Sequence, residues 1–270
     1  MFENHADMSK VTVIGTGNMG GAFAEALAKN RNIQLSVYDS CNSCAEKIAK
    51  AHKNVEVLSS MDEAVGTDII LIAVKPQVLP SIYERLSNLK SGLYISIAAG
   101  VTLETLRKNL KTDKVARFMP NIAAKIGHAV TAVAFSPELS DKERSAVMKV
   151  ALSAGSAFEL EEKLFAAFIG ISGSGIAYVF EFMHQMAMGG VREGIAYNRS
   201  LEIVADTMLS AVYLQKSKSE NAVELETRVC SARGATIEGV KALTDGNFGS
   251  AIINAVSAAA KKSEDMEKRT

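Results

Sequence analysis

Three glycines near the N-terminus, Gly15, Gly17 and Gly20, have a spacing that suits the binding of a pyrophosphate. Glycine at these positions allows a tight turn, admits a pyrophosphate close to the main chain and lets the following helix pack closely on the preceding strand. The start of that helix also offers unpaired N–H groups and the positive end of its dipole. Asp39 follows at roughly the twenty-residue offset expected of a carboxylate that binds the ribose. The pattern predicts a dinucleotide site; a glycine turn without a dinucleotide is the alternative.

The elements that must position this site are alternating strands and helices in the first half of the chain. The glycines lie between a β-type run at 11–14 and a predicted helix over 22–29, and Asp39 ends a predicted strand at 33–38. The continuous apolar run 68–74 is typical of a parallel strand that is buried on both faces. Further strands are predicted near 55–58, 93–97 and 114–119, and further helices over 44–51, 78–89, 103–110 and 141–154. This alternation predicts an α/β fold with a doubly wound, mostly parallel sheet.

Unusual residues follow four of the predicted strands, and in open α/β sheets ligands bind outside these carboxyl ends. Ala98, Ala99 and Gly100 are small and leave room for a flat ring to lie on the backbone. Asn121 can hydrogen-bond either a carboxamide or its own loop, and we assign Lys75 to ordering the cofactor loop rather than to proton transfer. The predicted cofactor-binding residues are Ile14, Gly15, Thr16, Gly17, Asn18, Met19, Gly20, Asp39, Ser40, Ala73, Val74, Lys75, Pro76, Ala98, Ala99, Gly100 and Asn121.

The second half of the chain has a different pattern. From about Phe158 strand patterns stop, and helical periodicity follows over 178–192, 200–215 and 252–260. The helix predicted over 174–189 has no clean polar face, and a helix that is apolar on most sides has to be buried on most sides. We predict a dinucleotide-binding domain over 1–157 and an all-helical substrate and dimerisation domain over 158–270, buried against a second copy. One compact monomeric bundle is the alternative.

Two glycine-containing turns open helices in this second half, one holding Ser174 and the other holding Gly234, Ala235 and Thr236. Unpaired N–H groups of the second turn, with the Thr236 hydroxyl, form a suitable site for a small carboxylate. We therefore predict these four residues as substrate-binding. For Thr236, an ordinary helix-capping role is the alternative.

Composition narrows the classes of partner and location. The chain has 270 residues, with 30 basic and 30 acidic side chains, so its formal net charge is zero. The absence of a basic stripe argues against nucleic acid or an anionic membrane surface as the main partner. We find no uninterrupted apolar run long enough to span a membrane and no apolar core of a signal peptide near the start. We therefore expect a cytoplasmic protein without a transmembrane helix.

Cys41 and Cys44 form a C-x-x-C pair, a spacing found in redox and zinc sites. Zinc would need two more ligands, and the sequence has no second C-x-x-C and only scattered histidines. The pair follows the second predicted strand, where the next helix begins. We interpret these residues as ordinary helix-start cysteines, with a redox role as the alternative, and predict no metal site.

Taken in order along nearly the whole chain, several motifs resemble the pyrroline-5-carboxylate reductase family. They are Gly15–Gly20, Val74–Gln77, Ser96–Gly100, Arg117–Asn121, Ser172–Gly175, Ala177–Tyr178 and Gly234–Ile237. The resemblance implies a Rossmann domain followed by a helical domain that intertwines in a homodimer, sometimes within larger rings of dimers. It further implies NADPH or NADH as the cofactor, and reduction of the small-molecule substrate Δ1-pyrroline-5-carboxylate to L-proline, the last step of proline biosynthesis.

Departures from the family pattern fall on the substrate side. Ile176 stands where the family has proline, Ile169 where it has threonine, and Ala232 and Arg233 replace the proline and first glycine of a Ser-Pro-Gly-Gly sequence. We name no catalytic side chain, because a protonated imine is already a strong electrophile and the chain lacks a convincing catalytic His, Cys or carboxylate pair. Placing two rings face to face and holding the carboxylate would suffice.

Other functions fit parts of the pattern. A β-hydroxyacid dehydrogenase or another imine reductase shares the layout, but hydroxyacid enzymes use a lysine in the first helix of the helical domain, and 170–188 contains none. A dinucleotide-binding dimer without turnover is the alternative from another class.

Asp39 also bears on the choice of cofactor. An acid at this position accepts hydrogen bonds from a ribose 2′-OH and repels a 2′-phosphate. No arginine lies in 40–44. We therefore predict that NADH is used at least as well as NADPH.

Overall fold

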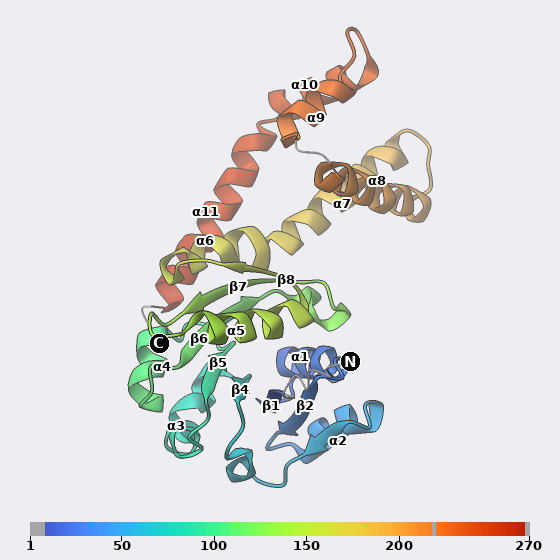
Figure 1. Ribbon diagram of the computed structural model, residues 1–270. Helices are drawn as coiled ribbons and strands as arrows, with labels where there is room; N and C mark the ends of the chain where they lie inside the picture. Colours follow the sequence, from blue (N-terminus) through green and yellow to red (C-terminus); the bar gives the residue numbers. More distant parts are fainter. Residues whose placement is uncertain (1–8, 218–219, 268–270) are drawn as a thin grey trace, which may run out of the picture. The chain divides into compact units, whose positions relative to one another are not determined.

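A computed structural model describes residues 9–217 and 220–267, which form two compact units (Figure 1). Of the described residues, the first unit comprises 9–173 and 260–267, and the second comprises 174–217 and 220–259. This division lies later in the chain than the predicted domain boundary at 157/158, and it returns the C-terminal residues to the first unit. The boundary at 157/158 stays a prediction.

The first unit is built on an eight-stranded sheet with the strand order β3-β2-β1-β4-β5-β6-β7-β8. The strands are β1 (Ser9–Ile14), β2 (Ile33–Tyr38), β3 (Val55–Val57), β4 (Ile69–Ile72), β5 (Leu93–Ser96), β6 (Val115–Pro120), β7 (Ala129–Phe135) and β8 (Gly155–Glu159). Strands β1 to β6 run parallel, β7 is antiparallel to β6, and β8 is parallel to β7. The predicted doubly wound, mostly parallel sheet is confirmed.

Helices cover both faces of this sheet because successive strand residues point to opposite sides. Val13 of β1 packs in a core with residues of α1, α2 and α5, whereas the next residue, Ile14, packs in a second core with residues of α3 and α4. The helices of this unit are α1 (Asn18–Ala28), α2 (Asn42–Ala51), α3 (Leu79–Asn88), α4 (Leu103–Leu110), α5 (Asp141–Ser153) and α6 (Phe165–Phe168). This arrangement brings the carboxyl ends of β1, β4 and β5 to one edge.

Strand β8 has no counterpart in the sequence prediction, which ended the strand patterns of the first half before it. The strand begins at Gly155, whose φ of +148° and close approach to Ala129 favour glycine. A Cβ at Gly155 would lie 2.2 Å from the carbonyl oxygen of Ala129 on β7. The short segment that carries Phe158 therefore extends the sheet by one strand.

A buried arginine joins the C-terminal residues to the sheet. Arg117 on β6 is only 1% exposed, and its guanidinium lies 4.9 Å from the ring centre of Phe165. It donates to Glu162 over 2.8 Å and also pairs with Glu267, at the end of α11 (Phe248–Glu267). A buried charge requires such partners. This cluster explains why the end of the chain belongs to the first unit.

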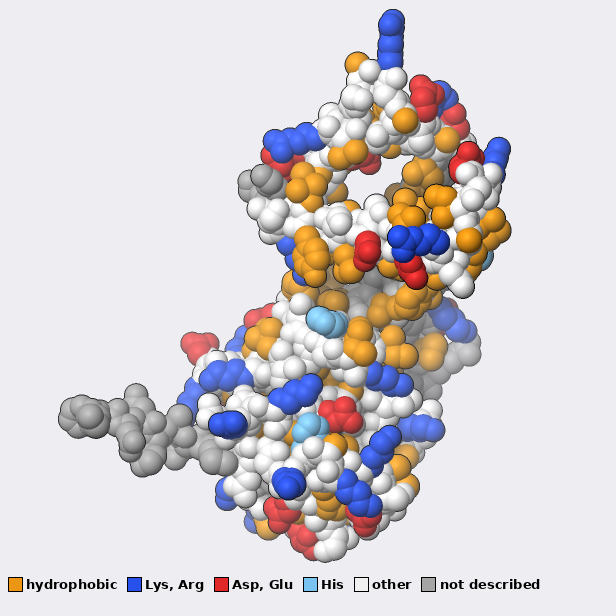
Figure 2. All heavy atoms as spheres, turned by 90° about the vertical axis from the view of Figure 1, so that its right-hand side faces the viewer, with side chains coloured by type: hydrophobic (Ala, Val, Ile, Leu, Met, Phe, Trp, Pro, Cys, Tyr) orange, Lys and Arg blue, Asp and Glu red, His pale blue; other side chains and the backbone are white. Residues whose placement is uncertain are grey.

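The second unit consists of helices that bury little of their own surface. They are α7 (Gly175–Arg192), α8 (Tyr197–Ser217), α9 (Ala222–Val229), α10 (Ala235–Asp245) and most of α11. Within the described chain, α9, α10 and α11 have no buried residue, and Tyr213 and Ile253 are 68% and 67% exposed. Figure 2 shows hydrophobic side chains over the part of the molecule that holds these helices. The alternative of a compact monomeric bundle does not describe this unit.

One helical segment, Glu162–Arg192, is long and apolar enough by length and composition to cross a membrane, with a mean hydropathy of 1.5. The prediction of no transmembrane helix rested on uninterrupted apolar runs, whereas an averaged window tolerates single polar residues. The core helix of a soluble protein passes the same test, and a third of the window is buried inside the described chain.

Candidate functional site

The glycine loop has the close contacts that the motif predicts. Gly15 has a φ of +93°, its N–H donates to the carbonyl of Tyr38 over 2.8 Å, and a Cβ there would lie 2.8 Å from the carbonyl oxygen of Ala73. A Cβ at Gly20 would lie 1.9 Å from the carbonyl oxygen of Gly15. The first and third glycines are thus required by the packing of β1, α1 and the chain after β4.

The second glycine differs, because the space beside it is open. A Cβ at Gly17 would meet nothing within 4 Å, and Gly17 is the N-cap of α1. No side chain caps this helix, so the exposed main chain at Gly17 and Asn18 is accessible to a ligand. Free N–H groups at a helix N-terminus bind phosphate. The residues present therefore fit the pyrophosphate of a dinucleotide.

Asp39 lies beside this loop at the end of β2. One carboxylate oxygen accepts the N–H of Thr16 over 2.6 Å and the Thr16 hydroxyl over 3.0 Å. The other oxygen accepts the N–H of Cys41 over 2.8 Å, across the exposed Ser40. The carboxylate is thus a half-buried anion that joins the glycine loop to the start of α2, and its contact with a ribose stays a prediction.

The other predicted strand ends lie next to the glycine loop. In the sheet Ile14 pairs with Ile72, and Ile72 pairs with Ser96, so Ala73 and Ala98 follow on neighbouring strands. Ala98 is buried, while the next residue Ala99 is exposed, and Gly100 has a φ of +76°. The structure therefore places small residues along one edge, as predicted.

Lys75 lies at the same edge. It follows Val74, is exposed, and is the N-cap of the short 3-10 helix Pro76–Val78. Proline at the first position of a helix is favoured because its missing N–H would lack a partner there in any case. The side chain of Lys75 has no hydrogen-bond partner among those found in the described chain, so it is available to a ligand.

Asn121 bonds its own loop, one of the two alternatives that the sequence left open. Its amide oxygen accepts the N–H groups of Ala123 and Val130 over 3.3 and 3.2 Å, and its Nδ2 donates to the hydroxyl of Ser172 over 3.1 Å. Asn121 is 5% exposed. Its amide therefore orders the loop after β6. The hydrogen-bond partner Ser172 lies in the Ser172–Gly175 motif but was not among the predicted site residues.

The predicted substrate-binding residues lie at helix starts in the second unit. Gly234 is the N-cap of α10, with no side-chain cap, so Ala235 and Thr236 are the first two helical residues. Thr236 is exposed and does not occupy the capping position. Ser174 precedes α7 and is half-buried. The N–H of Gly234 donates to the carbonyl of Ser231 over 3.0 Å, so it is not unpaired as predicted. The N–H groups that the start of α10 offers to an anion are those of Ala235 and Thr236.

Arg233, one of the departures from the family pattern, has a left-handed conformation with φ of +58°. Glycine adopts this conformation without the steric cost of a Cβ. The family's glycine at this position therefore has a physical reason, and the arginine here retains the same backbone geometry. Another departure, Ile169, begins a π-helical turn that ends at Gly173, an irregularity frequent at functional sites.

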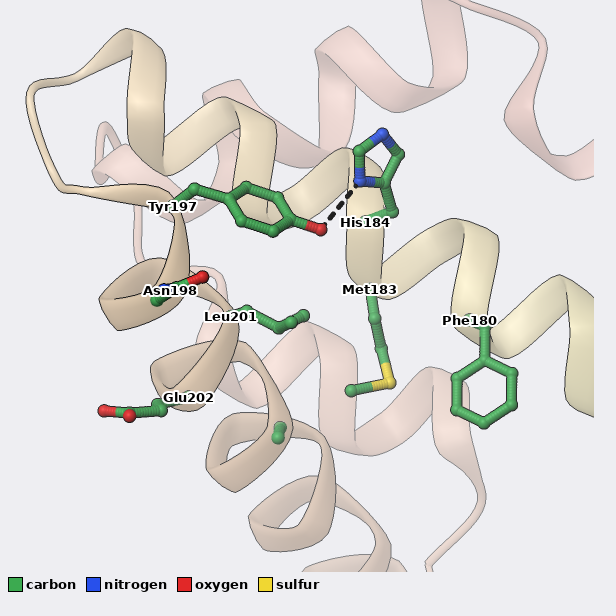
Figure 3. A pocket seen from close by; sticks show the side chains of 8 residues that line it. Phe180, Met183, His184, Tyr197, Asn198, Leu201 and Glu202 are labelled. Atoms are coloured by element: carbon green, nitrogen blue, oxygen red, sulfur yellow. Dashed lines mark hydrogen bonds between the residues drawn. The ribbon is translucent and has the colours of Figure 1, made fainter.

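A further cavity of about 540 Å³ lies between α7 and α8 (Figure 3). Phe180, Met183 and Leu201 give it mostly apolar walls, and His184 Nδ1 lies 3.0 Å from the Tyr197 hydroxyl at one side. Apolar walls and the absence of a lining cation do not suit a nucleotide phosphate or a carboxylate. Among the described residues no cluster of His, Cys, Asp and Glu could hold a metal ion.

Two families match separate parts of the chain. The family described as pyrroline-5-carboxylate reductase dimerisation matches residues 162–266, and the family described as NADP oxidoreductase, coenzyme F420-dependent, matches residues 10–100. The second match contains the glycine loop and Asp39. The first contains α7 to α10 and nearly all of α11.

Relatives match over almost the full length. Pyrroline-5-carboxylate reductases of Aquifex aeolicus and Escherichia coli are 34% and 31% identical, covering 95% and 96% of this chain and 97% and 98% of their own. The crystal structure of Plasmodium falciparum pyrroline carboxylate reductase with NADP bound is 27% identical, with a TM-score of 0.81, and covers 97% of this chain and 99% of that one. A Coxiella burnetii structure, 23% identical with a TM-score of 0.91 over 96% and 98%, has the same fold. The chain belongs to the pyrroline-5-carboxylate reductase family.

Proposed function

We propose that this protein reduces Δ1-pyrroline-5-carboxylate to L-proline with NADPH or NADH, the last step of proline biosynthesis. The carrying observation is the glycine loop, in which Gly15 and Gly20 are required by packing while the space beside Gly17 is open. Family membership over nearly the whole chain supports the same substrate. The relative with NADP bound supports the cofactor.

The chain's own residues would bind and orient. N–H groups around Gly17 and Asn18 would hold the pyrophosphate, and the small residues Ala98 to Gly100 would leave room for the nicotinamide ring. When bound, the cofactor would supply a hydride to the imine carbon. A protonated imine needs no dedicated general acid. This agrees with the predicted strand-end motifs, whose one charged side chain, Lys75, is assigned to ordering the cofactor loop. The N–H groups of α10 would hold the substrate carboxylate.

The test follows NAD(P)H absorbance with and without pyrroline-5-carboxylate. We expect turnover that depends on this substrate and stops when it is omitted. Binding of NAD(P)H without turnover would favour a non-catalytic dinucleotide-binding dimer. Turnover with β-hydroxyacids or other cyclic imines alone would favour the related oxidoreductases.

Cofactor preference is the first expected result. Because the Asp39 carboxylate lies beside the glycine loop, it should repel a 2′-phosphate, and NADH should be used at least as well as NADPH. Steady-state kinetics with both cofactors check this. A preference for NADPH in kcat/KM of about ten-fold or more, about 1.4 kcal/mol, would contradict it.

The second expected result concerns the substrate carboxylate. A hydrogen bond from Thr236 to a charged acceptor contributes roughly 1.5–3 kcal/mol. Thr236→Ala should therefore raise KM for pyrroline-5-carboxylate about ten-fold to a hundred-fold, with KM for the cofactor nearly unchanged.

Without such a hydrogen bond, Thr236→Ala should leave both KM values near normal, because Thr236 is the second residue of α10 and does not cap the helix. Arg233 places a cation beside this site, so the double variant with Arg233→Gly should reveal any loss that the arginine masks. Glycine fits the left-handed backbone there. An unchanged substrate KM in both variants would move the carboxylate site elsewhere.

Assembly gives the third expected result. Exposed apolar residues on α8, α9 and α11, the apolar cavity between α7 and α8, and the dimerisation family match all support a homodimer in which a second copy covers these helices. The family resemblance extends this to larger rings of dimers. Light scattering at micromolar concentration without detergent should show a dimer or a multiple of it; a stable, active monomer would contradict the assembly.

The remaining assignments complete the proposal. The apolar segment Glu162–Arg192 would be buried against the second copy rather than in a bilayer, so the proposed location is the cytoplasm, with neither membrane nor nucleic acid as partner. Residues 1–157 would bind the dinucleotide and 158–270 would carry the substrate and dimer contacts.

A further inference from the structure

Two cysteines lie beside Asp39, the carboxylate predicted to bind the ribose. Cys41 is the N-cap of α2 and Cys44 lies in its first turn, and both are exposed. Their sulfur atoms are 3.0 Å apart, with the Cys44 thiol donating to the Cys41 sulfur. Cys41 is the non-helical N-cap, so its backbone can adjust, and from 3.0 Å the two sulfurs need to approach by only about 1 Å to reach the bonding distance of about 2.05 Å.

The surroundings of Cys41 favour reaction at its sulfur. Its sulfur lies 3.3 Å from the hydroxyl of Ser43, and the hydrogen bonds from Ser43 and from the Cys44 thiol hold the pKa of Cys41 below its usual value. The pKa of Cys44 is raised, chiefly because its thiol proton is shared with Cys41. One sulfur is thus the more readily ionised, and ionised sulfur is the nucleophile in thiol–disulfide exchange.

A contact chain connects this pair to the glycine loop. The N–H of Cys41 donates to one oxygen of the Asp39 carboxylate over 2.8 Å. The other oxygen accepts the N–H of Thr16 over 2.6 Å, in the loop between Gly15 and Gly17. A shift of the Cys41 backbone therefore acts on the carboxylate that orders the loop.

We propose that Cys41 and Cys44 form a reversible disulfide that weakens dinucleotide binding, in place of the ordinary helix-start role that their spacing alone suggested. The oxidant is a small disulfide such as oxidised glutathione. The Cys41 thiolate attacks one sulfur of it and releases one thiol; Cys44 then attacks the Cys41 sulfur and releases the second. Two protein thiols are oxidised, one disulfide is reduced, and the two protons leave with the released thiols.

The effect on dinucleotide binding rests on the proposed function, whereas the formation of the disulfide does not. Closing the disulfide moves the start of α2. The hydrogen bond from the Cys41 N–H to the Asp39 carboxylate is then lost or lengthened. Thr16 then loses part of its anchor. The reduced pair gives the loop its ordered form, and the oxidised pair loosens it.

The test treats the purified full chain with mixtures of reduced and oxidised glutathione and measures its mass and its affinity for NADH. We expect wild type to lose about 2 Da, the two thiol hydrogens, with no retained glutathione and with Cys230 still open to alkylation. We expect the oxidised protein to bind NADH at least about five-fold more weakly, with recovery on reduction.

Cys44→Ser is the matched control. It should keep a glutathione adduct on Cys41, because the resolving thiol is missing, and without oxidant it should bind NADH like reduced wild type. A wild-type chain that keeps both thiols, or accumulates the adduct, would overturn the disulfide. A disulfide with unchanged NADH affinity would overturn the coupling. Reduced protein that binds neither NADH nor NADPH would defeat the proposed function while the mass measurement still decides the disulfide.

Discussion

Gly17→Ala should leave the fold intact and weaken NADH and NADPH binding about a hundred-fold or more. The added methyl meets no protein atom within 4 Å, and the backbone of Gly17 lies at φ of −64°, which alanine adopts freely. The methyl would instead occupy the space through which the pyrophosphate approaches the start of α1. Losing one or two hydrogen bonds to a charged phosphate costs about 3 kcal/mol, which is more than a hundred-fold in Kd. Fluorescence titration and thermal unfolding together measure both effects.

Gly20→Ala is the informative control because it should disturb the fold, whereas Gly17→Ala should leave the fold intact. A Cβ there would lie 1.9 Å from the carbonyl oxygen of Gly15 and 2.7 Å from the Cβ of Ala73, so the helix must move away from the strand. We expect a clear drop in melting temperature for this variant. If Gly17→Ala bound both cofactors normally, the pyrophosphate could not lie against this loop.

Arg117→Met should lower the free energy of unfolding by about 3 kcal/mol. The guanidinium is 1% exposed and pairs with Glu162 and Glu267, whose side chains are about a quarter exposed. Removing one member of a buried ionic cluster leaves the other charges without compensation, at a cost of about 3–5 kcal/mol. Because both carboxylates retain some water contact, we expect the low end. Urea unfolding at one fixed protein concentration measures the effect.

Arg85→Met provides the matched comparison. Arg85 pairs with Asp62 over 3.1 Å, but both side chains are largely exposed, at 44% and 66%. Such surface pairs contribute about 0–1 kcal/mol. If Arg117→Met cost no more than Arg85→Met, the cluster would not hold the C-terminal residues to the sheet. Glu267→Gln should give an intermediate loss, because Glu162 still neutralises the arginine.

Local patterns predicted most of the first unit. The strand at 33–38 and the helix at 103–110 have the predicted bounds, because apolar periodicity is a property of short segments. Strand β8 was missed because it is five residues long and follows a helix directly, and one Phe158 gives no alternation to detect. Local patterns also carry no information on the place of 260–267 in the first unit, since the pairing of Arg117 with Glu267 joins residues far apart in sequence.

Part of the candidate site was predictable from local sequence, and part was not. The glycine loop was predictable because a turn, a close approach and an open position are each set by residue type. The hydrogen bonds of Asp39 with Thr16 and of Asn121 with Ser172 were not predictable, because each joins separate segments that only the fold brings together. Arg233 shows the remaining case: its departure from the family pattern was visible, while its left-handed backbone was not.

The pairing of Arg117 with Glu267 has a consequence for synthesis on the ribosome. Chains emerge from the N-terminus, and early segments begin to fold while later ones are still being made. Glu162 follows Arg117 by 45 residues, whereas Glu267 follows it by 150. A nascent chain that already holds the whole sheet would therefore still carry Arg117 with half of its counter-charge. The first unit thus reaches its final form only after the second unit, Ser174–Ala259, has been translated, although nearly all of its residues were made long before.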